Sequence, residues 1–263
     1  MTTPTSAAFA RTVRGTGPGL LLAHGAGGGI EANYGPIMDG LAARHTVVGV
    51  DYPGSGDTLK AQEPLEVEEL AEQLIAAADA EGLDTFAVSG YSLGGPVAIR
   101  IAARYPERVT SLVLSATFAH ADTRTDLAAS IWQQLFESGQ HAVLAKYLNL
   151  MALSESTLNA LTPVQVQAAA EQLAPALPAG TGTQVDLVRR VDVRGDLAGI
   201  AVPTLVVVTT ADPLISAGLQ RQLAAAIPTA EVAEIPTGHL PFAERPQEWL
   251  NLISDFLALN SKG

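Results

Sequence analysis

The chain has 263 residues, of which 48% are apolar, and a formal net charge of −12. This length suits one large α/β domain, or a core with a small insertion, and the apolar fraction suffices for a sizeable core. The acidic balance argues against nucleic acid or an anionic membrane surface as partner, because both require basic patches. The absence of cysteine excludes disulfides, a thiolate nucleophile and a cysteine-based metal site.

The beginning of the chain carries no targeting signal that we can identify. Residues 1–10 are polar and lack the cationic start and apolar stretch of a signal peptide. No segment has the length and apolarity of a membrane span. From the sequence we therefore expect a cytoplasmic protein with no membrane partner.

Short apolar runs near the start of the chain predict strands. Residues 9–13 are predicted to form an edge strand, and residues 19–23 and 46–50 are continuous apolar runs, typical of strands covered on both faces. The run 19–23 ends in the glycine-rich loop 24–29. Residues 34–43, between the two runs, fit a helix. The pattern indicates the first strand–helix–strand unit of an α/β fold.

A second helix is predicted after the loop that follows residue 50. Residues 51–57 form a loop by their proline and glycine content. Pro64 is expected to open a helix, because proline is favoured at the first helical position, and Gly82 marks its end. Leu70 and Leu74 would share the buried face of this helix.

The stretch most informative about chemistry is Gly90-Tyr91-Ser92-Leu93-Gly94-Gly95. It follows a predicted strand, residues 86–89, and precedes a predicted helix, residues 96–104. A serine at the tip of a strand-to-helix turn is the context in which G-x-S-x-G forms a nucleophile elbow. Glycine stands two residues before and after Ser92, where bulkier side chains would collide in the strained turn. The following helix N-terminus favours developing negative charge.

The alternation of strands and helices stops after the predicted strand 109–114. Residues 123–191 contain no evident buried strand, but three helical stretches, at 127–136, 141–150 and 163–173. Prolines and glycines between 175 and 182 break the helical pattern. We predict that residues 123–191 form a helical insertion, called the lid below, over the carboxyl ends of the strands, with residues 1–122 and 192–263 as the core.

Strands and helices alternate again towards the end of the chain. Strands are predicted at 204–208 and 231–235, and helices at 216–227 and 246–259. Repeated strand–helix units imply an α/β fold with a mostly parallel, doubly wound sheet. Ligands of such sheets bind at the carboxyl ends of the strands.

Three polar residues each follow a predicted strand and should therefore emerge on one rim of the sheet. They are Ser92, Asp212 and His239, in the chain order of an α/β-hydrolase triad. A serine hydroxyl is a weak nucleophile at neutral pH and requires a base, for which histidine is suited. The carboxylate would hold the imidazole tautomer and stabilise its cation. We predict that these three residues are catalytic.

Two backbone amides are predicted to stabilise an oxyanion. One is that of Leu93, the residue after the serine, and the other is that of Ala26 in the glycine-rich loop. Gly27 lets the loop backbone run close to a substrate. We expect His24 to brace this loop rather than to take part in catalysis.

Taken together, these motifs resemble the α/β-hydrolase fold superfamily over nearly the whole chain. The motifs are His24-Gly25-Ala26-Gly27, the 51–56 loop, the elbow at 90–95, Asp212-Pro213 and Gly238-His239. The resemblance implies a helical cap, matching residues 123–191, and a hydrolase that forms an acyl-enzyme on Ser92.

The resemblance leaves some assignments open. In some relatives the acid follows the sixth strand, where Asp122 and Asp126 lie, but the turn at Asp212 fits the family's usual acid loop better. Many relatives carry Arg and Ser where this chain has Pro53 and Thr58, and some relatives that cleave carbon–carbon bonds carry the proline. Serine at the elbow tells against haloalkane dehalogenases and epoxide hydrolases, which use aspartate.

The expected substrate is a carboxylic ester, thioester or lactone with an apolar portion, because the lid is apolar. Tyr91, Trp132 and Phe136 are predicted to join Gly27 in lining the pocket. No metal-ligand spacing or phosphate loop is found, so no cofactor is expected. The alternatives are a carbon–carbon bond hydrolase, a biosynthetic enzyme performing elimination, cyclisation or acyl transfer, and a non-catalytic binder.

Overall fold

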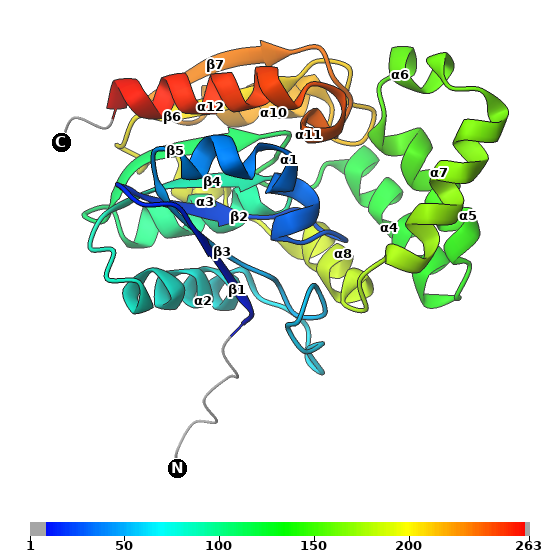
Figure 1. Cartoon of the computed structure of the whole chain (residues 1–263), viewed down its shortest axis with the longest axis horizontal. Coiled ribbons are helices and arrows are strands. Elements are labelled where there is room, and N and C mark those ends of the chain that lie inside the picture. Colours follow the sequence, from blue (N-terminus) through cyan, green and yellow to red (C-terminus); the bar gives the residue numbers. More distant parts are fainter. Residues whose placement is uncertain (1–8, 261–263) are drawn as a thin grey trace.

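The protein is an α/β structure built on one twisted sheet (Figure 1). The computed structural model describes residues 9–260, and the strands in that range form a seven-stranded sheet in the order β1-β3-β2-β4-β5-β6-β7. The strands are β1 (Arg11–Arg14), β2 (Gly19–Ala23), β3 (Thr46–Val50), β4 (Phe86–Tyr91), β5 (Val109–Ser115), β6 (Thr204–Thr209) and β7 (Ala230–Ile235). Only β1 runs antiparallel to its neighbour. The predicted fold class is confirmed.

Helices cover both faces of the sheet, and the side chains of β2 show why. Leu20 and Leu22 pack in one apolar cluster with α1 (Ile30–Ala42) and α12 (Pro246–Asn260). Leu21, between them, packs in the opposite cluster, which includes the buried faces of α2 (Val67–Ala80) and α3 (Gly94–Arg104). Alternate residues of a strand point to opposite faces, so a strand covered on both sides is apolar throughout. Figure 1 shows α12 and α2 on opposite sides of the sheet.

A run of helices separates β5 from β6 in the chain. Figure 1 shows α4 to α7 gathered beyond one end of the sheet. The remaining helices are α4 (Thr123–Glu137), α5 (His141–Ala152), α6 (Glu155–Ala160), α7 (Pro163–Ala176), α8 (Thr181–Arg190), α9 (Arg194–Leu197), α10 (Ala217–Ala225) and α11 (Pro241–Glu244). Of these, α10 packs against β6 and β7. The stretch 123–191 is helical, as predicted, but α6 and α8 were not expected.

Helix α8 forms where glycine was expected to break the pattern. Gly180 is its N-cap, and the helix continues through Gly182. Gln184, Val185 and Val188 are buried on it, and the helix packs along α4. This packing outweighs the helix cost of one glycine, about 1 kcal/mol.

Helix α2 begins later than predicted. Its first residue is Val67, not Pro64. Leu65, between them, is fully buried in the core. The proline therefore ends the preceding loop instead of opening the helix.

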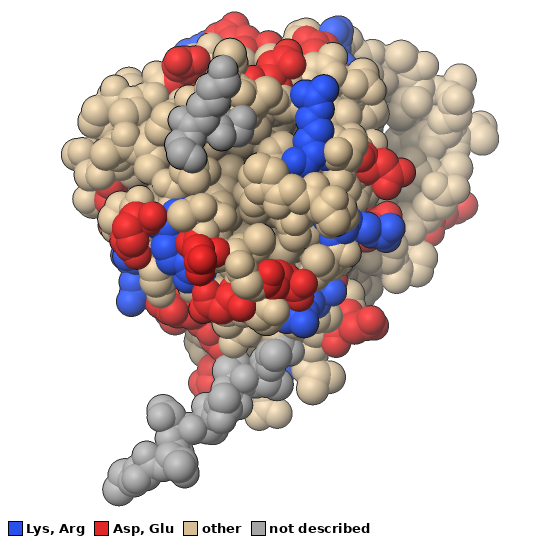
Figure 2. Space-filling view, turned by 60° about the vertical axis from the view of Figure 1, so that its left-hand side comes forward, with Lys and Arg blue, Asp and Glu red and all other residues tan. Residues whose placement is uncertain are grey.

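Charged side chains lie interspersed on the face drawn in Figure 2. Surface ion pairs include Arg108 with Asp79 at 2.7 Å and Arg221 with Glu234 at 2.6 Å. Exposed pairs of this kind contribute at most about 1 kcal/mol each to stability. Among residues 9–260, no helix has both the length and the apolarity needed to cross a bilayer.

Candidate active site

The turn between β4 and α3 holds Ser92 in a left-handed backbone conformation, with φ of 52°. Non-glycine residues adopt this region rarely, and it marks strain. A Cβ atom at Gly94 would collide with the carbonyl oxygen of Ala23 at the end of β2, and one at Gly90 would collide with the carbonyl of Gly94. The glycines of the elbow are therefore required by close backbone packing.

The three residues predicted to be catalytic form one hydrogen-bonded chain. His239 Nε2 lies 2.9 Å from Ser92 Oγ, and His239 Nδ1 lies 2.8 Å from Asp212 Oδ2. All three residues are buried. An ionised carboxylate only accepts hydrogen bonds, so Nδ1 carries the proton and Nε2 accepts from the serine hydroxyl. This arrangement can take a proton from Ser92 and return it to a leaving group.

The carboxylate of Asp212 is fixed by its own loop. Oδ1 accepts from the amides of Leu214 and Ile215, both at 2.9 Å. Oδ2 accepts from the hydroxyl of Thr209 at 2.9 Å, besides the imidazole. Gln220 supports the loop by accepting from the Thr209 amide at 3.0 Å and donating to the Ile215 carbonyl at 2.8 Å.

The two other carboxylates considered from the sequence are engaged elsewhere. Asp122 caps α4, where its Oδ1 accepts from the Thr125 amide at 2.8 Å. Asp126 pairs with Arg189 within the lid at 2.8 Å. Neither contacts His239, so geometry favours Asp212 as the partner of the imidazole.

In the glycine-rich loop, the Ala26 amide lies between two amides that are engaged in hydrogen bonds. The Gly25 amide donates to Asn33 Oδ1 at 2.9 Å, and the Gly27 amide donates to Gln184 Oε1 at 2.8 Å. Across the part of the chain that the structure describes, the amides of Ala26 and Leu93 make no hydrogen bond. These are the two donors predicted for an oxyanion.

His24 braces this loop from the side of the core. Its Nε2 accepts from the Tyr52 amide at 2.9 Å, its Nδ1 lies 2.8 Å from the Gly25 carbonyl, and its ring stacks on that of Tyr52. Complete burial lowers the pKa of His24 to about 4, so the ring is neutral at physiological pH. Its Nδ1–H then donates to Gly25. Its contacts are those of the bracing residue that we expected.

A cavity of about 240 Å³ lies beside Ser92 and His239. Tyr91, Trp132 and Gly27 line it, together with the backbone neighbour Ala26. Its other large apolar lining residues come from the lid and from the segments after β6 and β7: Leu148, Leu173, Leu177, Leu214, Leu240 and Phe242. No Lys, Arg, Asp or Glu is among the described residues that line it, so the cavity favours a neutral ligand.

Phe136 does not line this cavity. Its ring stacks on that of His141 with centroids 5.1 Å apart, and it borders a separate hollow near Lys60 and Glu137. The residue lies near the end of α4, about one helical turn beyond Trp132. A shared helix was the basis of the prediction, but the two side chains reach different spaces.

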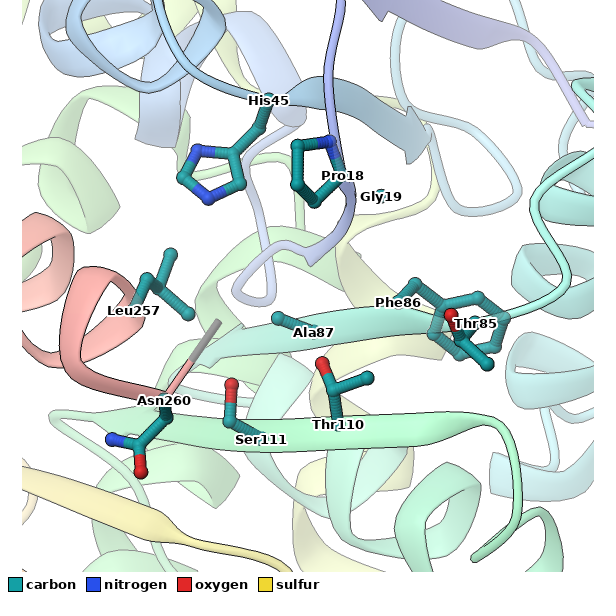
Figure 3. Close-up of a pocket in the computed structure, with 10 residues that line it drawn as sticks. All are labelled: Pro18, Gly19, His45, Thr85, Phe86, Ala87, Thr110, Ser111, Leu257 and Asn260. Atoms are coloured by element: carbon teal, nitrogen blue, oxygen red, sulfur yellow. The ribbon is translucent and has the colours of Figure 1, made fainter. Parts of the chain in front are cut away.

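A second cavity, of about 170 Å³, opens at the amino-terminal edge of the sheet (Figure 3). It is bordered by the first residues of β2 and β4, by Ser111 near the start of β5, and by Asn260 at the end of α12. Among the described residues, His45 is the only ionisable side chain that borders it, and burial lowers the pKa of this histidine. The His45 ring lies 3.2 Å from the Leu41 carbonyl and makes no hydrogen bond to a hydroxyl in the described chain.

Several side chains that hold the site escaped the sequence analysis. Asn33 and Gln184 hold the glycine-rich loop, and the Thr117 hydroxyl donates to the Ser92 carbonyl at 2.6 Å. Glu244 accepts from the amide of Gly238 at 3.0 Å and from the hydroxyl of Ser154 at 2.6 Å. No local motif marks these residues, because the groups that they bind lie elsewhere in the sequence, at spacings that belong to no known motif. No group of three His, Asp or Glu residues suited to a metal occurs within residues 9–260.

Comparison with known proteins matches most of the chain. Residues 18–246 match the family described as alpha/beta hydrolase fold. The chain is 34% identical over 247 residues to the pyrrolizixenacetamide deacetylase of Xenorhabdus hominickii, covering 93% of this chain and 92% of that protein. It is 29% identical over 251 residues to the pimeloyl-(acyl-carrier protein) methyl ester esterase of Aromatoleum aromaticum, covering 90% and 97%. The enol-lactonase of Burkholderia xenovorans LB400 has the same fold, with a TM-score of 0.84, 21% identity, and coverage of 95% and 96%.

Proposed function

The chain belongs to the α/β-hydrolase fold family, and we propose that it is a serine hydrolase that cleaves a neutral carboxylic ester or lactone through an acyl-enzyme on Ser92. The proposal depends on two hydrogen-bond contacts beside an apolar cavity, from His239 Nε2 to Ser92 Oγ at 2.9 Å and from His239 Nδ1 to Asp212 Oδ2 at 2.8 Å. The names of the relatives, a deacetylase and a methyl ester esterase, support hydrolysis of an acyl bond.

Acylation would begin with attack of Ser92 Oγ on the substrate carbonyl while the hydroxyl proton moves to His239 Nε2. The carbonyl oxygen becomes an oxyanion, which accepts from the amides of Ala26 and Leu93. Asp212 stabilises the imidazolium. Collapse of the tetrahedral intermediate transfers the proton from His239 to the leaving alcohol.

Deacylation would repeat these steps with water as the nucleophile. His239 takes a proton from the water, whose oxygen attacks the acyl carbon, and the same amides hold the second oxyanion. The carboxylic acid leaves when His239 returns the proton to Ser92 Oγ. Every proton is thus accounted for by the side chains present.

The cavity supports a small, neutral and largely apolar substrate. Its volume of about 240 Å³ lies just below the range of about 300 to 1,000 Å³ found for sites of drug-sized ligands. A carboxylate or an ammonium placed among Leu148, Leu173 and Phe242 would lose its hydration without gaining an ion pair. We therefore expect short neutral acyl esters, lactones and thioesters to be hydrolysed better than esters that carry a charge.

The test is labelling with a fluorophosphonate probe, which reacts only with an activated serine. We expect mass spectrometry to locate the adduct on Ser92, and Ser92→Ala to abolish it while the protein stays folded. In parallel, p-nitrophenyl acetate, butyrate and hemisuccinate are compared. The butyrate should be hydrolysed at least tenfold better, in kcat/KM, than the hemisuccinate, whose acyl chain has similar length but bears a charge.

Two outcomes would contradict the proposal. Folded protein that neither reacts with the probe nor hydrolyses any of these esters would favour carbon–carbon cleavage, elimination or binding. Labelling at Ser92 together with a preference for the hemisuccinate would support the acyl-enzyme mechanism but contradict the proposal that the substrate is neutral.

A further inference from the structure

The glycine-rich loop is held by two carboxamide side chains that come from different parts of the molecule. Asn33, on α1 of the core, accepts from the amide before Ala26, and Gln184, on α8 of the lid, accepts from the amide after it. The Gln184 bond orients the peptide plane that joins Ala26 to Gly27, and the plane that carries the Ala26 amide is held through the Gly25 carbonyl by His24 Nδ1 at 2.8 Å. The Ala26 amide itself makes no hydrogen bond in the described chain, and Ala26 lines the cavity beside Ser92.

Gln184 is itself fixed by two further hydrogen bonds. Its Nε2 donates to Ser55 Oγ at 2.9 Å and to the Pro53 carbonyl at 3.2 Å. The residue is fully buried. A buried carboxamide whose donors and acceptor are all engaged is strongly oriented, because each unmade bond would cost about 1 to 3 kcal/mol. Its oxygen therefore points at the Gly27 amide.

The beginning of α8 is docked tightly on the loop after β3. The Gly180 amide donates to the Gly54 carbonyl at 3.1 Å, and a Cβ atom at Gly54, whose φ is +81°, would collide with Gly180. This backbone contact places Gln184 one helical turn later, against Pro53 and Ser55. Helix α8 is thus one part of the lid that is anchored to the core at the site.

We propose that Gln184 is a positioning residue that orients the oxyanion loop, so that the lid completes the oxyanion hole. The expected effect of Gln184 on catalysis rests on the proposed hydrolase function, whereas its expected effect on the order of the loop does not. Without Gln184, the Gly27 amide loses its acceptor, and the peptide plane between Ala26 and Gly27 is free to rotate about the backbone bonds at Ala26 and Gly27. Gly27, with φ of +68°, offers little resistance to such rotation.

The experiment compares Gln184→Met, which keeps the length of the side chain and removes its hydrogen bonds, with Arg190→Met. Arg190 lies on the same helix and also joins the lid to the core, by donating to the Leu65 carbonyl at 2.7 Å, but it does not touch the loop. It therefore controls for a general loosening of the lid. Hydrogen exchange of the amides in residues 25–29 reports the loop without any substrate.

We expect Gln184→Met to accelerate exchange of the loop amides at least tenfold. The kcat for p-nitrophenyl acetate should fall about tenfold while KM changes less than threefold, because the lost interaction forms only in the transition state. Binding of a trifluoromethyl ketone, which forms an oxyanion on the enzyme, should weaken by a similar factor. Arg190→Met should leave all three quantities within about twofold.

Unchanged loop exchange in Gln184→Met, or a fall in kcat no larger than in Arg190→Met, would overturn the proposal. If Gln184→Met does not fold, Ser55→Ala replaces it, because it removes one of the two acceptors that orient the Gln184 amide. It should accelerate loop exchange about threefold, and no acceleration would overturn the proposal. A wild-type protein without esterase activity would refute the proposed function alone, since the exchange comparison still decides the role of Gln184.

Discussion

The nucleophile elbow and the glycine-rich loop differ in how each is held. The elbow is built from consecutive residues: β4, a strained serine and α3, with Gly90 and Gly94 allowing close packing. The glycine-rich loop depends on Gln184, a side chain 157 residues away along the chain. A sequence motif therefore predicts a site whose geometry is made by consecutive residues. It does not predict a geometry that depends on side chains far away in the sequence.

The loop that carries His239 resembles the glycine-rich loop in this respect. The His239 amide donates to the carbonyl of Ala152, at the end of lid helix α5, at 2.6 Å. The His239 carbonyl accepts from the Tyr91 hydroxyl at 3.0 Å. Glu244 joins the same loop to the lid through Gly238 and Ser154. The lid therefore contributes both to the pocket and to the support of two loops.

Replacing Asp212 should produce the largest effect, because it removes a member of the hydrogen-bonded chain. Asp212→Asn should lower kcat about 10⁴-fold, since the amide favours the wrong imidazole tautomer. Asp122→Asn, the matched control, keeps a good N-cap residue and should retain activity within about threefold. Steady-state kinetics on p-nitrophenyl acetate measure both. Equal losses in the two variants would contradict the assignment of the acid.

The steric account of the elbow predicts the next largest effect. Gly94→Ala places a methyl group against the Ala23 carbonyl oxygen, and we expect a loss of roughly 4 kcal/mol in the free energy of unfolding. Gly195→Ala, in α9, meets no atom within 4 Å and should be neutral or slightly stabilising. Urea denaturation followed by circular dichroism distinguishes them. A stable Gly94→Ala protein would show that the elbow is less tightly packed than the structure indicates.

The brace at His24 makes the protein sensitive to acid. The folded-state pKa of about 4 lies below the ordinary value of 6.5, so the unfolded chain binds the proton first. The contribution of neutral His24 to the free energy of unfolding is therefore fully present above pH 6.5. It is lost as the pH falls towards 4, which lowers the stability by about 3 kcal/mol. His24→Asn should be less stable at pH 7 but should show a shallower decline between pH 6.5 and 4. Parallel unfolding curves at several pH values test this, and identical slopes would exclude His24 as the source.

The junction of the His239 loop with the lid should give the smallest effect. Glu244→Gln keeps the shape of the side chain but loses the charge that strengthens its bonds to Ser154 and Gly238, which should cost about 1 kcal/mol of stability. The expected fall in kcat is within about threefold. Glu248→Gln, which breaks only an exposed pair with Arg245 at 3.0 Å, should change stability by less than about 0.5 kcal/mol. Similar losses in both variants would remove any special role of Glu244.

Sequence reasoning selected Ser92, Asp212 and His239 because each lies in the turn or loop after a strand of a parallel sheet, and such ends meet at one edge. It selected Leu93 as the residue after the serine and Ala26 from the glycine-rich loop, and the structure leaves both amides without partners in the described chain. The prediction was wrong where tertiary packing overrides a local signal. Helix α8 forms in spite of its glycines because its apolar face packs on α4.

The fold class and the elbow can be predicted from the amino-acid sequence alone, because apolar periodicity and backbone sterics act between neighbouring residues. Which side chains line the cavity and which hold the loops becomes visible only in the folded structure. Trp132 and Phe136 lie on one helix yet reach different spaces, and Gln184 lies just after the glycines that were expected to break the helical pattern. Such contacts join residues far apart in the chain, where no local rule relates one position to the other.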